Sequence, residues 1–246
     1  MKSNTLLITA TINPSANFLT VSCPLERKKQ YYDSLYYMIC RSNFDNIIFC
    51  ENSGATNLNK DFWTDLAELH DKKIEFLIYE EKCFQNKSKG YMECMLINHV
   101  IENSKILAPN ITSFYKMTGR LIIKNINQIL SAHQLHKNVF MLSGISSRNS
   151  FDTRFFKINI NIFKSHIYPN AMNINDINGY YMEHLFYDIF NKQKITTSCV
   201  QGYNKNTFKY LPDIQGLSGS TGMTYSMGNV KKWLKGILLK LGAYKV

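Results

Sequence analysis

The chain has 246 residues, 45% of them hydrophobic, so its length allows one large α/β domain or two small ones and its composition excludes a disordered chain. The 29 Lys and Arg residues exceed the 18 Asp and Glu residues and give a net charge of +11. This charge predicts attraction to a nucleic acid, an anionic membrane surface or a phosphorylated small molecule, but it does not choose among them.

The six cysteines are far apart and include no C-x-x-C pair, so we expect reduced thiols and no zinc site. The apolar run near the N-terminus is too short for a signal peptide, and no run approaches the roughly 20 apolar residues of a membrane span. These patterns predict a cytoplasmic protein.

Short apolar runs alternate with amphipathic segments in the first part of the chain. Strands are predicted at 6–12, 46–50 and 74–79, and helices at 26–39 and 61–70. This βαβαβ order predicts a parallel, doubly wound sheet. No G-x-G-x-x-G follows the first strand, so the dinucleotide fingerprint is absent.

Polar residues follow two of these predicted strands. Glu51 ends the second strand, where open α/β sheets bind ligands, and it is either an acceptor for a ribose hydroxyl or an ordinary turn acid. Lys89 and Gly90 open a helix whose free amides would favour an anion. The alternative is that Ser88 and Glu93 cap this helix while the lysine is solvated.

The segment 115–125, YKMTGRLIIKN, has the pattern most typical of an anion site. Gly119 offers the backbone freedom to bring N–H groups close to a ligand, and Lys116 and Arg120 offer two cations, of which the planar guanidinium suits phosphate oxygens. The alternative is a strand with a tight turn and two solvated cations.

A helix is predicted at 126–136 and a strand at 138–142, followed by a serine-rich loop. Asp152 and Arg154 then lie among phenylalanines. They form either a structural ion pair or a site in which the aspartate has the shifted pKa that a general base needs.

A further helix is predicted at 179–191. Glu183 and His184 are adjacent on it and point about 100° apart, so we expect one of them to face a cleft. The glycine-rich segment 212–225, which contains Ser218, Gly219 and Ser220, is either a loop that closes over a ligand or a plain surface loop.

The C-terminal segment 229–246 sorts apolar residues and lysines onto different sides of a predicted helix. This pattern is typical of a helix in a membrane interface, although a helix docked on the core of its own protein would look similar. We therefore expect one domain at 1–228 and a basic amphipathic tail at 229–246.

Six short motifs, ENSG, K-G-x-x-E, K-x-T-G-R, D-T-R-F-F, E-H and S-G-S-T-G, occur in an order that resembles bacterial glycosyltransferases of lipopolysaccharide O-antigen or capsule synthesis. The resemblance implies a Rossmann-like, GT-A-type sheet, mostly parallel and flanked by helices, a nucleotide-sugar donor, and a glycan or lipid-linked acceptor. The chain departs from that family in lacking a convincing D-x-D for a divalent cation. We therefore expect no metal and no cofactor, with cations neutralising the diphosphate instead.

The resemblance also implies roles for individual residues. Asp152 and Glu183 are the two candidates for the base that deprotonates the acceptor, and His184 could orient this base or bind the leaving phosphate. The donor-binding candidates are Thr9, Thr11, Glu51, Lys89, Lys116, Thr118, Gly119, Arg120, Arg154, Ser218, Gly219 and Ser220.

Two other functions compete with glycosyl transfer. A methyltransferase or nucleotidyltransferase could use the same strand ends, although a methyltransferase would be expected to carry a glycine-rich turn after the first strand. A nucleic-acid-binding module could stack bases on the 15 tyrosines and 15 phenylalanines, but these recur at core spacings instead of alternating with cations. We therefore expect no nucleic-acid partner.

Overall fold

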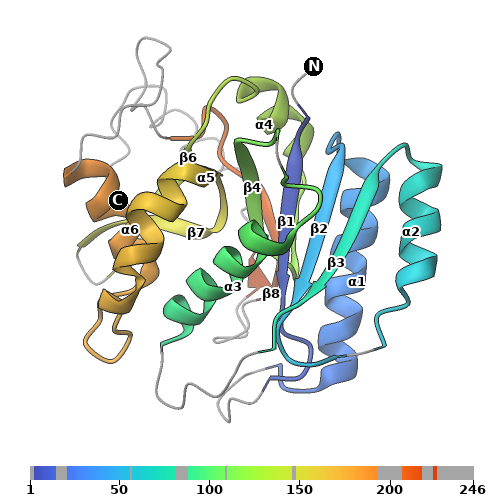
Figure 1. Cartoon of the computed structure of the whole chain (residues 1–246), viewed down its shortest axis with the longest axis horizontal. Coiled ribbons are helices and arrows are strands. Elements are labelled where there is room, and N and C mark those ends of the chain that lie inside the picture. Colours follow the sequence, from blue (N-terminus) through green and yellow to red (C-terminus); the bar gives the residue numbers. More distant parts are fainter. Residues whose placement is uncertain are drawn as a thin grey trace.

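A central six-stranded sheet organises the computed structural model, which describes residues 3–14, 21–55, 57–80, 88–108, 110–145, 148–192, 207–217 and 224–225 (Figure 1). Its order is β3 (Lys73–Ile78), β2 (Asn46–Glu51), β1 (Thr5–Ala10), β4 (Ser113–Thr118), β7 (Arg148–Asn159) and β6 (Val139–Ile145). The first four are parallel, and β7 is antiparallel to both of its neighbours. The sheet is therefore mainly parallel, as the sequence predicts.

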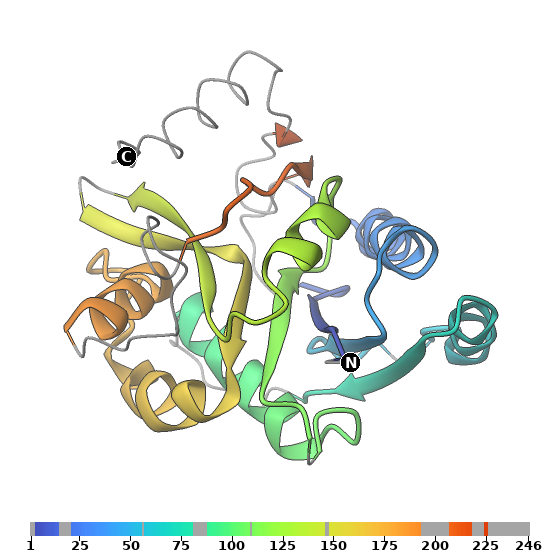
Figure 2. The same cartoon turned by 90° about the horizontal axis from the view of Figure 1, so that it is seen from above.

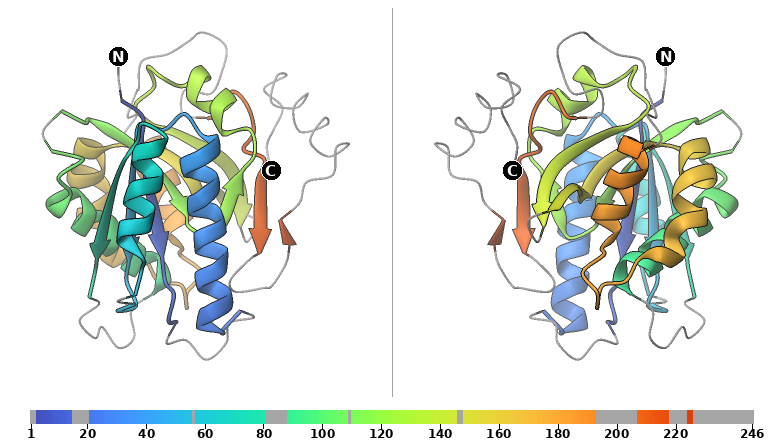
Figure 3. Two further views of the ribbon diagram at one scale, coloured as in Figure 1. Left: turned by 90° about the vertical axis from the view of Figure 1, so that its right-hand side faces the viewer. Right: turned by 90° about the vertical axis from the view of Figure 1, so that its left-hand side faces the viewer.

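Helices cover both faces of this sheet. On one face α1 (Pro24–Arg41) and α2 (Lys60–Leu69) pack side by side, as the left view of Figure 3 shows. On the other face lie α3 (Lys89–Asn103) and α6 (Met182–Lys192), together with the helical segment made of α5 (Ile160–Ile162), η1 (Phe163–Ile167) and η2 (Tyr168–Asn173). The apolar residues accordingly form two core clusters, one on each face.

The strands explain why both faces are covered. All six residues of β1 and all six of β2 are buried. A parallel strand with both faces buried reads as a continuous apolar run instead of an alternating one. The runs at 6–12 and 46–50 have that character, which is why the sequence located them.

The second half of the fold departs further from the sequence prediction. The helix expected at 126–136 is α4 (Ile126–Ala132), and the helix expected at 179–191 starts only at Met182. The elements that were not predicted include the 12-residue strand β7 and the helical segment from Ile160 to Asn173. Figure 2 shows that the hairpin of β6 and β7 forms the edge of the sheet farthest from α2.

A second, three-stranded sheet corrects the prediction of a single loop at 212–225. It pairs β5 (Leu121–Ile123), β8 (Ile214–Leu217) and β9 (Thr224–Tyr225) in antiparallel order. Ser218, Gly219 and Ser220 lie outside the described residues, and so does the whole of the predicted amphipathic tail at 229–246.

Candidate functional site

The carboxyl ends of β1 and β4 lie side by side, because the two strands are parallel neighbours from Leu6 opposite Tyr115 to Thr9 opposite Thr118. The chain leaves β1 through α1 on one face of the sheet and returns to β4 from α3 on the other. Such a reversal of connection between neighbouring strands opens a crevice in which α/β proteins bind ligands.

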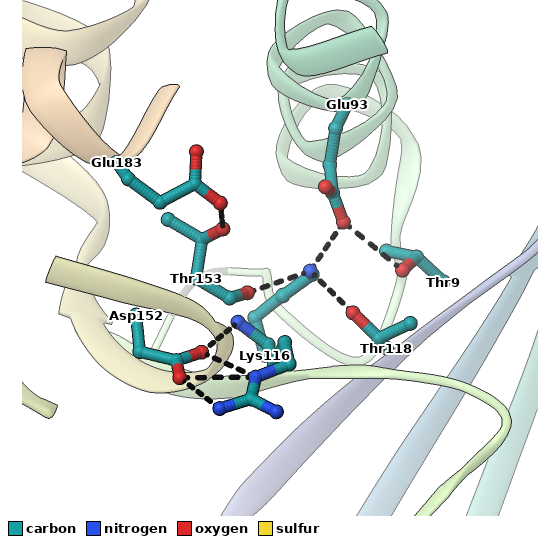
Figure 4. Close-up of polar contacts among 8 residues, drawn as sticks. Thr9, Glu93, Lys116, Thr118, Asp152, Thr153 and Glu183 are labelled. Atoms are coloured by element: carbon teal, nitrogen blue, oxygen red, sulfur yellow. Dashed lines mark hydrogen bonds and ion pairs between the residues drawn. The ribbon is translucent and has the colours of Figure 1, made fainter. Parts of the chain in front are cut away.

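Lys116 lies at the centre of a polar network on the α3 face (Figure 4). Its side chain is 0% exposed, and its Nζ forms an ion pair with Glu93 of α3. The same Nζ donates to the Thr153 carbonyl at 3.0 Å and to Thr118 Oγ1 at 3.3 Å. Thr9 Oγ1 donates to the Glu93 carboxylate at 3.3 Å.

These contacts correct two predictions. The Lys116 ammonium is buried and paired with a carboxylate, so it is not a free cation facing a donor diphosphate. Glu93 does not cap α3, since its side chain reaches Lys116. Ser88 alone does so, with its Oγ accepting from the Tyr91 N–H at 3.3 Å.

Glu183 lies at the start of α6 and lines a pocket of about 860 Å³ together with Glu93, Lys89, Asp176 and Tyr181. Thr153 Oγ1 donates to Glu183 Oε1 at 2.6 Å. The pKa of Glu183 is raised, mainly because the carboxyl is buried. The hydrogen bonds from Thr153 and from the Glu183 backbone lower this pKa, whereas the negative charges of Glu93 and Asp152 raise it further. A carboxylate with a raised pKa at a pocket wall is suited to accept a proton.

Lys89 is exposed at the first position of α3 and lines the same pocket. Its backbone N–H donates to Asp176 Oδ2 at 2.9 Å, which ties the start of α3 to the turn before α6. The side chain thus remains at the pocket wall, where a cation could contact an anionic ligand.

Asp152 is the weaker of the two candidate bases. Its carboxylate forms an ion pair with Arg154, whose Nε lies 2.9 Å from both carboxylate oxygens. Burial alone would lower the pKa of Arg154, but the hydrogen bonds and charge of Asp152 outweigh it and raise that pKa. The guanidinium also lies 4.4 Å from the centre of the Tyr225 ring. The structural ion pair, which the sequence left open as an alternative, is therefore present.

His184 does not share the pocket with Glu183. Its side chain is 1% exposed, and its Nδ1 accepts from the Tyr181 backbone N–H at 3.2 Å. The prediction that one of the adjacent pair faces a cleft is correct for Glu183. The buried ring argues against His184 as a ligand of the leaving phosphate, and its other predicted role, orienting the base, stays a prediction.

Glu51 ends β2 and is completely buried. Its carboxylate accepts from the backbone N–H groups of Ile12, Ser53 and Ala55 at 2.9 to 3.0 Å. Thr11 Oγ1 donates to Asn52 Oδ1 at 2.6 Å in the same region. These contacts fit the alternative of a turn acid, since they anchor two strand ends to each other and occupy both carboxylate oxygens.

Close packing explains the glycine at position 119. A Cβ there would lie 2.7 Å from Ile8 Cγ2 and 2.7 Å from the Thr9 carbonyl oxygen, and its N–H donates to that same oxygen at 3.0 Å. The sequence predicts that Gly119 lets backbone N–H groups approach a ligand, and its own N–H is instead used within the fold.

Arg120 turns toward α1, where its Nη1 donates to Gln30 Oε1 at 3.3 Å. The predicted cations therefore do not meet at one place: Lys89 and Lys116 lie on the α3 side of the sheet, whereas Arg120 lies on the α1 side.

Three residues with contacts near the ends of β1 and β4 were missed or misread in the sequence: Arg27, whose Nε donates to the Thr11 carbonyl at 2.8 Å, Glu93 and Thr153. Arg27 lies on the buried stripe of α1 with Tyr31 and Ser34, at spacings of four and three residues. A cation on an otherwise uncharged helical stripe is a signal that the sequence did carry. Glu93 and Thr153 carry no such signal, because their roles depend on contacts between distant segments.

In the part of the chain that the structure describes, no three or more His, Cys, Asp or Glu side chains are grouped so that they could hold a metal ion. Over the same residues, no helix has both the length and the apolar character that crossing a membrane requires.

The sequence matches no protein-family model and no curated protein. Solved structures are similar to parts of the fold. A protein described as a nucleotide-diphospho-sugar transferase, from Desulfovibrio desulfuricans, is 9% identical with a TM-score of 0.47, covering 79% of this chain and 78% of that one. A nucleoside-diphosphate-sugar pyrophosphorylase from Vibrio cholerae is 7% identical with a TM-score of 0.47, covering 76% and 88%. Mouse xyloside xylosyltransferase 1 is 11% identical with a TM-score of 0.41, covering 78% and 82%.

Proposed function

We propose that this protein is a glycosyltransferase that moves a sugar from a nucleotide-sugar donor to a hydroxyl of a glycan or lipid-linked acceptor. The observation that carries the proposal is Glu183, a carboxylate with a raised pKa, held by Thr153 at the wall of a pocket beside the carboxyl ends of β1 and β4. We further propose, from the motif order that resembles O-antigen and capsule enzymes, that the reaction belongs to the synthesis of a bacterial surface polysaccharide.

In this mechanism the acceptor hydroxyl lies against Glu183, whose carboxylate takes the proton as the acceptor oxygen bonds to the anomeric carbon. The bond from that carbon to the donor diphosphate breaks, and the nucleoside diphosphate leaves. The pocket has two other carboxylates: Glu93 is paired with Lys116, and Asp176 accepts from the backbone N–H of Lys89. We therefore assign the role of base to Glu183. Inversion at the anomeric carbon follows if the acceptor attacks in a single step.

The leaving diphosphate needs positive charge. Lys89 from the α3 side and Arg120 from the α1 side are the proposed cations, so the diphosphate is proposed to lie between them at the ends of β1 and β4. No divalent metal takes part in this proposal. The tail at 229–246 is proposed to contact an anionic membrane surface, where a lipid-linked acceptor would be found.

A thermal-unfolding panel tests the donor class directly. The full chain is heated with uridine, guanosine, cytidine and adenosine diphosphates, with the corresponding nucleotide sugars, and with S-adenosylmethionine. A ligand that binds only the folded state at 100 times its Kd adds about 2.7 kcal/mol of stability. We expect one nucleoside diphosphate to raise the midpoint temperature of unfolding. Stabilisation by S-adenosylmethionine alone would contradict the proposal.

The metal requirement is tested on the same preparation once a donor is known. Transfer should continue in excess chelator, because protein cations carry the charge of the leaving group. Activity that disappears in chelator and returns only with Mg²⁺ or Mn²⁺ would contradict this part of the proposal.

A further inference from the structure

Two arginines from different segments converge on the α1 side of the sheet. Arg27 in the first turns of α1 is 4% exposed, and Arg120 in the turn after β4 is 9% exposed. Each contacts one of two adjacent residues of α1: Gln30 accepts from Arg120 Nη1 at 3.3 Å, and the Tyr31 hydroxyl accepts from Arg27 Nη2 at 3.3 Å. The Tyr31 ring also packs against Gly119, the residue before Arg120.

All partners of the two guanidinium groups are neutral among the described residues. Arg27 Nε donates to the Thr11 carbonyl at 2.8 Å and its Nη1 to the Val21 carbonyl at 3.2 Å. Arg120 has only Gln30 as a partner there, and its Nε is buried without a hydrogen-bond acceptor. No ion pair of either arginine occurs in this part of the chain, although a guanidinium has five N–H groups to satisfy.

This arrangement is unfavourable for the free protein. A buried cation that no anion neutralises costs several kcal/mol, and two such cations repel each other. Burial lowers the pKa of Arg27, Tyr31 opposes this, and the nearby charge of Arg120 lowers it further. A role in stability alone does not account for two buried, unneutralised guanidinium groups. A bound anion does, because it supplies both the missing charge and the missing acceptors.

The position of the pair also favours a ligand. Arg27 binds the carbonyl of Thr11 just after β1, and Arg120 follows β4, so the pair lies at the carboxyl ends of the two neighbouring strands where the sheet connections reverse. A ligand in that crevice can meet one guanidinium from α1 and one from the turn after β4.

We propose that Arg27 and Arg120 together bind a phosphate group with two negative charges, one guanidinium from α1 and one from the turn after β4. Planar guanidinium groups bind phosphate oxygens in pairs of parallel hydrogen bonds, and two of them match a dianion in charge. The identification of this group as the diphosphate of a nucleotide donor rests on the proposed function. The anion site itself does not rest on the proposed function. It adds Arg27 to Arg120, which was already proposed as a cation for the diphosphate.

The experiment measures binding of inorganic pyrophosphate, inorganic phosphate and nucleoside diphosphates to the full chain by isothermal titration calorimetry. The variants are Arg27→Gln, Arg27→Lys and Arg120→Gln. The matched control is Lys29→Gln, which removes the same charge from an exposed position of α1 paired with Asp33. We expect each glutamine variant to weaken pyrophosphate binding about tenfold or more, and the control to bind as the wild type does.

Arg27→Lys keeps the positive charge but removes the planar guanidinium with its paired N–H donors, so it should retain only part of the pyrophosphate affinity. Equilibrium unfolding without ligand provides a second readout, because removing an unneutralised buried cation should leave stability unchanged or increase it. Wild-type affinity in both glutamine variants would overturn the proposal, and so would a wild type that binds neither pyrophosphate nor any nucleoside diphosphate. Anion binding that depends on both arginines, in a protein without transferase activity, would support the site and reject only the proposed function.

Discussion

Glu183 and Asp152 differ as bases because of the residue beside each of them. Thr153 gives Glu183 one neutral hydrogen bond, whereas Arg154 neutralises Asp152 with a full charge. We therefore expect Glu183→Gln to lower the transfer rate by about 10²- to 10⁴-fold while nucleotide binding persists. Asp152→Asn should retain much more activity, and initial rates with calorimetric donor binding distinguish the two. Equal losses in both variants would contradict the assignment.

The pH profile of transfer is a second test of Glu183. Its pKa is raised, so the carboxylate is protonated at a higher pH than an ordinary glutamate and loses its capacity as a base there. The value of kcat/KM should accordingly fall as pH falls through that raised pKa. Removing the Thr153 hydroxyl with Thr153→Val should move this acidic limb to higher pH, since the hydrogen bond from Thr153 lowers the pKa. An unchanged profile would show that another group titrates.

Lys116 is more deeply buried than Glu93, so removing one partner of this ion pair should cost a different amount of stability than removing the other. Lys116 is 0% exposed and Glu93 is 28% exposed. Glu93→Gln leaves a fully buried ammonium without a counter-charge and should cost about 3–5 kcal/mol of unfolding free energy. Lys116→Met should cost less, because water can reach the carboxylate that remains. The double variant should recover part of the Glu93→Gln loss in denaturant titrations, and strict additivity would contradict the pairing.

At the level of elements, the turn between β4 and β5 is fixed by how closely β4 approaches β1 and α1. Gly119→Ala should destabilise the fold by about 1–3 kcal/mol, because the new Cβ would meet the Thr9 carbonyl and the Ile8 side chain within 3 Å. Gly54→Ala is the control, since a Cβ there meets nothing within 4 Å and only its positive φ of 71° causes strain. Chemical denaturation of both variants measures the difference.

The elements that the sequence located are those with a local signal. Buried parallel strands such as β1 and β2 are short apolar runs, and α1 repeats its buried residues at helical spacing. β7 was missed because Asp152, Arg154 and Lys157 interrupt its apolar residues. Each of these polar residues is stabilised by a partner that no local pattern shows, such as the His133 carbonyl 2.9 Å from Lys157 Nζ.

The candidate site was predictable in place but not in detail. The βαβ order predicts that ligands bind at the carboxyl ends of the strands, and Glu183 is a candidate from its predicted helix. The pairing of β4 with β1 was not predicted. The pairing of Lys116 with Glu93 could not be anticipated, because it depends on which face of β4 meets α3. A lysine in a glycine-containing turn motif therefore looked free in the sequence and is buried in the fold.

At the scale of the whole molecule, the fold should lose stability in mild acid. His133 is buried, its Nε2 accepts from the Lys209 N–H at 2.9 Å, and burial, with the charges of His136, Lys157 and Lys209, lowers its pKa to about 3. The unfolded chain takes up this proton below about pH 6.5, whereas the folded chain does not. The stability that this residue contributes is thus complete above pH 6.5 and decreases as pH falls toward 3.

This loss can be measured in denaturant titrations at pH 7 and pH 4.5. The contribution of His133 should decrease by about 2–3 kcal/mol between these values, since each pKa unit corresponds to about 1.4 kcal/mol. His133→Gln should show a correspondingly smaller change between the two pH values. The same pH dependence in wild type and variant would mean that other groups cause the acid sensitivity.

The placement of the two arginines and of Glu183 on opposite faces of the sheet has a consequence for where a donor can react. Arg27 and Arg120 lie on the α1 side and the base lies on the α3 side, with the ends of β1 and β4 between them. Since the anomeric carbon of a nucleotide sugar is bonded directly to the diphosphate, the diphosphate must itself lie across these strand ends, with its sugar-bearing phosphate toward Glu183. We expect inorganic pyrophosphate to occupy the same place and to compete with the full donor without reacting.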